Sequence, residues 1–103
     1  MKPKATQLLE LFRNIDPDMS VSCALALLYC NEEKTQRDVE TRLGLSNAAA
    51  SRNVSYWSEW KKHKVQGQNM INQTIDPEDR RYRLVSLNAK GKAFIAQIND
   101  ITE

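Results

Sequence analysis

Two helical patterns meet at a short turn, and this junction constrains the fold more than any other part of the sequence. Residues 35–43, TQRDVETRL, begin with a threonine that can cap a helix and continue with apolar residues at helical spacing. Gly44 can adopt the left-handed backbone that ends a helix, and Ser46 can cap the next helix at once. The sequence therefore predicts a helix-turn-helix unit over residues 35–60.

The second helix of this unit has two unlike faces. At about 100° per residue, Ala50, Val54 and Trp57 form one apolar stripe of the kind that packs on a core. Such a stripe leaves a face of small and hydroxyl side chains around one arginine: Ala48, Ser51, Arg52 and Ser55. That face either lies in solvent or lets the helix approach a second surface closely, with the arginine supplying hydrogen-bond donors. These residues alone leave both explanations open.

The composition is that of one small globular domain. The chain has 103 residues, of which 41% are hydrophobic, and it contains only three glycines and three prolines. No apolar run approaches the length of a membrane span, and the amphipathic N-terminus lacks the apolar core of a signal peptide. We therefore expect an intracellular protein with no membrane partner.

Residues that commonly carry chemistry are sparse. Cys23 and Cys30 are seven positions apart in one expected helix, so their Cα atoms should lie roughly 10 Å apart, beyond disulfide reach. His63 is the only histidine, and the cysteines lack the spacing of a zinc site. We expect reduced thiols, no metal, no cofactor and no enzymatic activity. A redox-sensing cysteine is the alternative, and it would need an exposed thiol of low pKa.

Positive charge is concentrated in the second half of the chain. Between Arg52 and Lys92 there are nine Lys or Arg and four Asp or Glu, a net charge of +5, whereas the whole chain carries only +2. An anionic partner should therefore bind this half. The basic cluster at residues 61–64, KKHK, has a simpler explanation, because cations after a helix end complement the helix dipole.

Two further helices are expected before the turn unit, and a hairpin and a helix after it. The first helices cover about residues 4–14 and 19–30, the second being apolar nearly all round. Residues 70–75, MINQTI, and 80–87, RRYRLVSL, are typical of strands, with a turn between them at DPED. Asn88 can then cap a final helix.

This order of elements predicts a winged helix-turn-helix. We expect a single domain, residues 1–103, that is mainly α (α+β), with about five helices and a β-hairpin wing over residues 69–87. The combination of a helix-turn-helix with a hairpin that carries arginines is more specific than either half.

The wing sequence resembles that of the MarR family of bacterial winged-helix transcription regulators. In DRRYRLVSLNAKG, the positions that match the family signature are Asp79, Arg81, Leu87, Lys90 and Gly91, while Asn88 replaces the usual Thr. The segments TQRDVETRLGLSNAAASR and MINQTIDPEDRR resemble the family's helix-turn-helix and first wing strand. The resemblance covers residues 35–98.

Besides the change at Asn88, the sequence departs from the family pattern at three points. Asn69 stands where a glycine usually opens the wing, a change that asparagine tolerates because it visits the left-handed region. Gln73 stands where the family often has arginine. Family members also usually have a longer C-terminal helical region, which implies a short member of the kind that a phage or plasmid could carry. The resemblance leaves open whether a small-molecule effector binds.

The resemblance implies a cytoplasmic regulator, in a bacterial or phage-infected cell, that recognises specific double-stranded DNA. We expect a repressor that occupies promoter DNA as a homodimer. Small residues keep the second helix thin enough for the major groove, and Arg52 is the best candidate for a guanine contact. The expected DNA-binding residues of the helix-turn-helix are Thr35, Gln36, Arg37, Asn47, Ala48, Ala49, Ser51, Arg52, Asn53, Ser55 and Tyr56.

The wing and the chain ends complete the expectations. Arg80 and Arg81 should carry the wing towards the minor groove or the backbone, although an ion pair to Asp79 or Asp76 is the alternative role for Arg81. The terminal segments 1–15 and 89–103 should form the dimer through Leu8, Leu11, Phe12, Phe94, Ile98 and Ile101. The alternative function is a winged-helix module that binds protein in the host machinery without recognising DNA.

Overall fold

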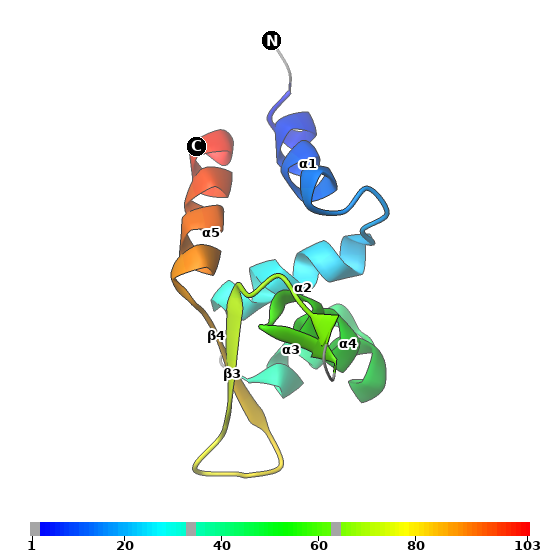
Figure 1. The fold of residues 1–103 in the computed structure, drawn as a ribbon, viewed down its shortest axis with the longest axis vertical. Coiled ribbons are helices and arrows are strands. Elements are labelled where there is room, and N and C mark those ends of the chain that lie inside the picture. Colours follow the sequence, from blue (N-terminus) through cyan, green and yellow to red (C-terminus); the bar gives the residue numbers. More distant parts are fainter. Residues whose placement is uncertain (1–2, 33–34, 63–64) are drawn as a thin grey trace.

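The computed structural model describes residues 3–32, 35–62 and 65–103 (Figure 1). Its elements, in chain order, are α1 (Lys4–Ile15), α2 (Val21–Glu32), α3 (Gln36–Leu43), α4 (Asn47–Trp57), β1 (Trp60–Lys62), β2 (Val65–Gln66), β3 (Ile71–Ile75), β4 (Arg83–Leu87) and α5 (Ala89–Thr102). The predicted mainly α fold, with five helices and a β-hairpin wing, is confirmed.

The molecule is elongated, with principal extents of 48, 28 and 27 Å. Figure 1 shows α1 and α5 at one end, α2 crossing the middle, and the hairpin of β3 and β4 projecting at the other end. Lys4 Nζ at the start of α1 donates a hydrogen bond to the backbone oxygen of Glu103 after α5, at 2.7 Å. The two terminal helices are therefore antiparallel to each other, and they lie at the end of the molecule opposite the wing.

The core is centred on Trp57. Its side chain is fully buried, its indole N–H donates to the Cys23 carbonyl at 2.7 Å, and its ring meets Phe12 edge-on at 6.3 Å. Ala50 and Val54 are also fully buried, which confirms the apolar stripe predicted for α4. Burial of this stripe fixes which side of α4 remains on the surface.

The local signals at the helix ends are confirmed. Thr35 Oγ1 accepts from the Asp38 N–H at 3.2 Å, and Ser46 Oγ accepts from the Ala49 N–H at 3.2 Å. Gly44 has φ of 65°, the left-handed conformation that ends α3. These hydrogen bonds satisfy backbone donors that a helix start leaves free.

One expectation about α4 is wrong. The helix ends at Trp57 and not at residue 60, and a short hairpin of β1 and β2, which the sequence pattern did not reveal, follows it. Ser58 adopts extended backbone, and its hydroxyl donates to the Val54 carbonyl. Gly67 then lets the chain return closely, because a Cβ there would lie 2.3 Å from the Ser58 oxygen.

The basic cluster accordingly does not follow a helix end. Lys61 and Lys62 belong to β1, whereas His63 and Lys64 lie outside the described residues. The C-terminal carbonyls of α4 receive hydrogen bonds from the backbone instead. Gln68 N–H donates to Tyr56 at 2.9 Å and Met70 N–H donates to Trp57 at 2.7 Å. The segment that leads into the wing thus caps α4.

The wing is fixed at its base on both sides. β3 and β4 pair antiparallel from Ile71 opposite Leu87 to Ile75 opposite Arg83. Isolated bridges join Thr35 to Leu84 and Ser58 to Ile71. The hairpin is therefore attached by backbone hydrogen bonding to the start of α3 and to the end of α4.

Asparagines open and close the wing as the sequence predicts. Asn69 has φ of 54°, in the left-handed region expected for this residue. Asn88 caps α5, since its Oδ1 accepts from the Gly91 N–H at 2.9 Å, and its Nδ2 donates to the Asn69 carbonyl at 2.7 Å. The two ends of the wing are therefore hydrogen-bonded to each other.

The two cysteines are buried and are not joined by a disulfide, as expected for reduced core thiols. Burial raises the pKa of Cys30 to about 12, so this thiol stays protonated and unreactive at neutral pH. Within the described ranges, no helix has the length and apolar character needed to cross a membrane.

Candidate nucleic-acid interface

A polar hollow of about 410 Å³ lies where α3, α4 and the wing meet. Three separate parts of the sequence line it: Gln36, Arg37, Glu40, Asn47, Ser51, Arg81, Tyr82 and Arg83. Six of these lie in the first turn of a helix or in the wing, where backbone N–H groups and cations attract anions. The fold thus brings together residues that the sequence predicts to bind DNA from both the helix-turn-helix and the wing.

The surface of α4 beside this hollow is thin. Ala48 and Arg52 are exposed, and Ala49, Ser51, Asn53 and Ser55 are half-buried. No hydrogen bond or ion pair of Arg52 is found among the described residues, which agrees with a side chain directed to solvent. The polar, narrow face predicted for this helix is therefore present and uncovered.

Asn47 at the start of α4 has a partner within the chain. Its Nδ2 donates to Oε2 of Glu40 on α3 at 2.9 Å. Because a carboxylate can only accept, this hydrogen bond fixes which way the amide faces. None of the described residues donates a hydrogen bond to the amide oxygen of Asn47, so this oxygen can accept from an external donor.

The start of α3 differs from the expectation in one side chain. Thr35 is committed to capping, and Arg37 is exposed, as an anion contact requires. Gln36, however, is only 9% exposed, and its Oε1 has no hydrogen-bond partner within the described part of the chain. A buried side chain does not reach a phosphate, so only the backbone N–H of Gln36 is placed for the predicted role.

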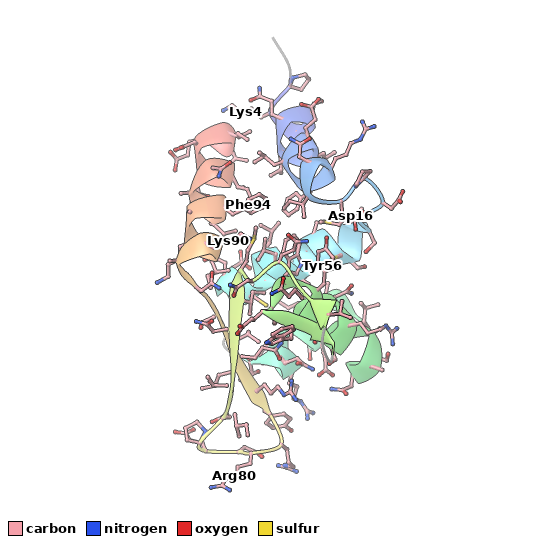
Figure 2. All side chains as sticks on the ribbon, viewed as in Figure 1. Lys4, Asp16, Tyr56, Arg80, Lys90 and Phe94 are labelled. Carbon is pink, nitrogen blue, oxygen red and sulfur yellow. The ribbon has the colours of Figure 1, made fainter. Side chains whose placement is uncertain are left out.

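Tyr56 lies on the side of α4 away from the wing, which does not suit the predicted DNA contact. Figure 2 shows its side chain next to Asp16, towards the end of the molecule formed by α1 and α2. Its ring lies 5.1 Å from that of Trp57, edge-on, and Gln68 Nε2 donates to its hydroxyl at 3.4 Å. Burial, followed by the nearby Asp16 carboxylate, raises the pKa of Tyr56. We conclude that Tyr56 is a core-edge residue, because its ring packs against Trp57.

The wing turn is held by Asp79. Its carboxylate accepts from Nε of Arg81 at 3.0 Å and from Nη2 at 2.8 Å, and also from the Arg81 backbone N–H at 3.1 Å. These hydrogen bonds lower the pKa of Asp79 to about 2. The ion pair considered for Arg81 is therefore present, while its side chain remains 80% exposed. Arg80 is exposed at the wing tip (Figure 2).

Two wing residues at the hollow were missed from the sequence. Tyr82 accepts a hydrogen bond from Nη1 of Arg37, and Arg83 Nη1 donates to Oε1 of Gln73 at 3.3 Å. Gln73 also donates to Ser58 Oγ at 2.6 Å, so it serves the wing base. Strand alternation could have indicated the position of Tyr82. Residues two apart in a strand face the same side, and Leu84, two residues after Tyr82, pairs with Thr35 at the start of α3.

Three of the six residues predicted for dimerisation are buried inside the chain. Phe12, Phe94 and Ile98 are 6–8% exposed, and the two phenylalanine rings meet edge-on at 5.5 Å. They are core residues because α1 packs against α5 of the same chain. Leu8, Leu11 and Ile101 are only partly buried. The large apolar side chains exposed at this end are Leu9, at 63%, and Val21, at 73%.

No protein-family model and no curated protein matches the sequence. Solved structures share the fold. The complex of S. aureus MepR with DNA superimposes with a TM-score of 0.67 at 22% identity, over 96% of this chain and 73% of MepR. For MarR the TM-score is 0.64 at 17% identity, over 98% and 76% of the two chains. For the PcaV transcriptional regulator from Streptomyces coelicolor the TM-score is 0.63 at 19% identity, over 95% of this chain and 74% of PcaV. The chain therefore has the winged-helix fold of the MarR-type regulators.

Proposed function

We propose that this protein is a MarR-type transcription regulator that binds specific double-stranded DNA, acting as a repressor in the cytoplasm. The observation that carries the proposal is the convergence of Arg37, Arg81 and Arg83 on one hollow beside the exposed face of α4. Two distant parts of the chain, the start of α3 and the wing, supply these cations, so their proximity is a product of folding. The DNA-bound state of MepR, which has the same fold, supports the same partner here.

In the proposed complex, α4 lies in the major groove. The small side chains Ala48 and Ala49 allow close approach, and Arg52 donates two hydrogen bonds to one guanine. The backbone N–H groups at the start of α3 hold a phosphate together with Arg37. The wing tip, through Arg80 and Arg81, follows the backbone towards the neighbouring minor groove.

A salt titration separates this function from protein binding. Binding to DNA releases counterions, so the logarithm of affinity falls steeply and linearly with the logarithm of salt concentration. Binding to an apolar protein surface changes little with salt. Selection of bound sequences from random DNA then tests specificity, and failure to enrich any motif would contradict a regulator of defined promoters.

Replacement of both Arg80 and Arg81 by alanine should weaken binding to every DNA sequence. The slope of log affinity against log salt should decrease by about 0.9 for each phosphate that the wing no longer neutralises. The exposed wing tip contributes little to the core, so the unfolding midpoint should stay close to that of the parent. Binding isotherms at several salt concentrations provide the measurement. An unchanged slope would show that the hairpin does not touch DNA.

Asp79→Ala tests whether the wing acts through its net charge or through the position of Arg81. It removes a negative charge, so simple electrostatics predicts tighter binding. If the hydrogen bonds from Arg81 to Asp79 position the wing, this variant should bind more weakly instead. The sign of its effect therefore distinguishes a positioned wing from one that is merely basic.

We also propose that the regulator is a homodimer joined through its terminal helices. Exposed Leu9 and partly buried Leu8 and Leu11 on α1, with Ile101 on α5, form an apolar end opposite the wing. Sedimentation equilibrium at micromolar concentration should give twice the chain mass of 11.8 kDa. Leu9→Glu should shift the mass towards a single chain, because it places a charge on this apolar end. A single-chain mass for the parent protein would exclude the dimer.

A further inference from the structure

One aromatic ring contacts arginines from both halves of the interface. Tyr82 follows the wing turn, and its hydroxyl accepts a hydrogen bond from Nη1 of Arg37 at the start of α3. The guanidinium carbon of Arg37 lies 5.2 Å from the ring centroid, and that of Arg81 lies 5.5 Å from it. Both distances are within the range of a cation–π attraction.

This arrangement restricts two side chains that would otherwise be mobile. A long exposed arginine samples many rotamers unless its neighbours hold it. Arg81 is held by the Asp79 carboxylate and by the ring, and Arg37 is held by the hydroxyl and by the same ring. Tyr82 is half-buried whereas both arginines are exposed, so the less mobile residue orders the more mobile ones.

The same contact also fixes the wing relative to the helix-turn-helix. The bridge between Thr35 and Leu84 joins the two at the wing base. The hydrogen bond between Arg37 and Tyr82 lies two residues farther along each segment, closer to the wing tip. These two links to α3, together with the bridge between Ser58 and Ile71, resist a swing of the hairpin away from α3.

We propose that Tyr82 is a positioning residue that presents Arg37 and Arg81 together to two phosphates of the DNA backbone. This inference rests on the proposed function. Tyr82 carries no charge and acts through the arginines. The pairing with Asp79 engages Nε and Nη2 of Arg81, so Nη1 is left to donate to a phosphate oxygen.

Tyr82→Leu tests the proposal through a quantity that a neutral residue does not normally change. The slope of log affinity against log salt reports how many phosphates the protein neutralises, and it can be measured on a duplex of random sequence. Release of one or both positioned arginines should reduce the slope by about 0.9 to 1.8. Tyr82→Phe keeps the ring and removes the hydroxyl, so its slope should fall by about half as much.

The effect should disappear where the arginines are absent. In a background of Arg37→Ala with Arg81→Ala, Tyr82→Leu should change neither the affinity nor the slope. Further weakening in that background would mean that Tyr82 touches DNA itself, which overturns the positioning role. If Tyr82→Leu does not fold, the slope of Tyr82→Phe decides, and an unchanged slope overturns the proposal.

Tyr29 offers a matched control. The guanidinium of Arg42 lies 4.1 Å from its ring centroid, on the surface of α2 and α3, so Tyr29→Phe removes a hydroxyl from a similar pair. We expect no change of slope for this variant.

The proposed function fails separately: if Arg37→Ala and Arg81→Ala each leave the slope unaltered, the hollow is not a DNA interface. If they lower it and Tyr82→Leu does not, only the positioning role fails.

Discussion

Arg52→Ala should weaken binding to the specific site by about 1 to 3 kcal/mol and relax the preference at one base step in each half-site. The exposed guanidinium sits on the small-residue face of α4, where it can donate two hydrogen bonds to a guanine edge. Affinity for random DNA should fall much less, since random sequences rarely offer that guanine in register. Competition binding with selected and random duplexes provides both values.

Arg13→Ala is the control for the charge that Arg52→Ala removes. Arg13 is an exposed arginine in the last turn of α1, at the end of the molecule opposite the wing. Its removal should leave the ratio of specific to random affinity unchanged. If Arg52→Ala lowers both affinities equally, then Arg52 contacts a phosphate and does not read a base.

Trp57→Ala should reduce the free energy of unfolding by about 3 to 5 kcal/mol. The side chain is fully buried, and its removal leaves a cavity and deletes the hydrogen bond from the indole N–H to the Cys23 carbonyl. Since a small domain is stable by only about 5 to 15 kcal/mol, this is a large fraction of the total. Urea unfolding followed by circular dichroism gives the change in free energy.

Trp60→Ala is the corresponding control, because the chain offers a second tryptophan that is 50% exposed. It should change the free energy of unfolding by less than about 1 kcal/mol. Equal changes for the two variants would contradict the placement of Trp57 at the centre of the core.

Features governed by neighbours in the sequence could be predicted. The caps at Thr35, Ser46 and Asn88 depend on groups three residues away, and Gly44 and Asn69 reveal the need for positive φ by their residue types. The pair of Asp79 with Arg81 is equally local. Alternation and helical periodicity sufficed for the wing and for the buried stripe of α4.

Contacts between residues that are far apart in the sequence could not be predicted. Phe12 and Phe94 come from opposite ends of the chain, and nothing in either apolar stripe indicates that they pack on each other and not on a second copy. The contact of Arg37 with Tyr82 joins residues 45 positions apart. The burial of Gln36, only 9% exposed in spite of its polar side chain, is likewise set by the packing of the folded chain and not by its neighbours in the sequence.

The hairpin of β1 and β2 is a side loop closed at its base. Gly67 N–H donates to the Glu59 carbonyl at 3.0 Å, and Asn69 N–H donates to the Ser58 carbonyl at 3.0 Å. These hydrogen bonds join the end of α4 directly to the segment that leads into the wing. A change in the length of residues 60–66 should therefore leave the spacing between α4 and the wing intact. The site is therefore suited to carry a fluorophore or an inserted tag.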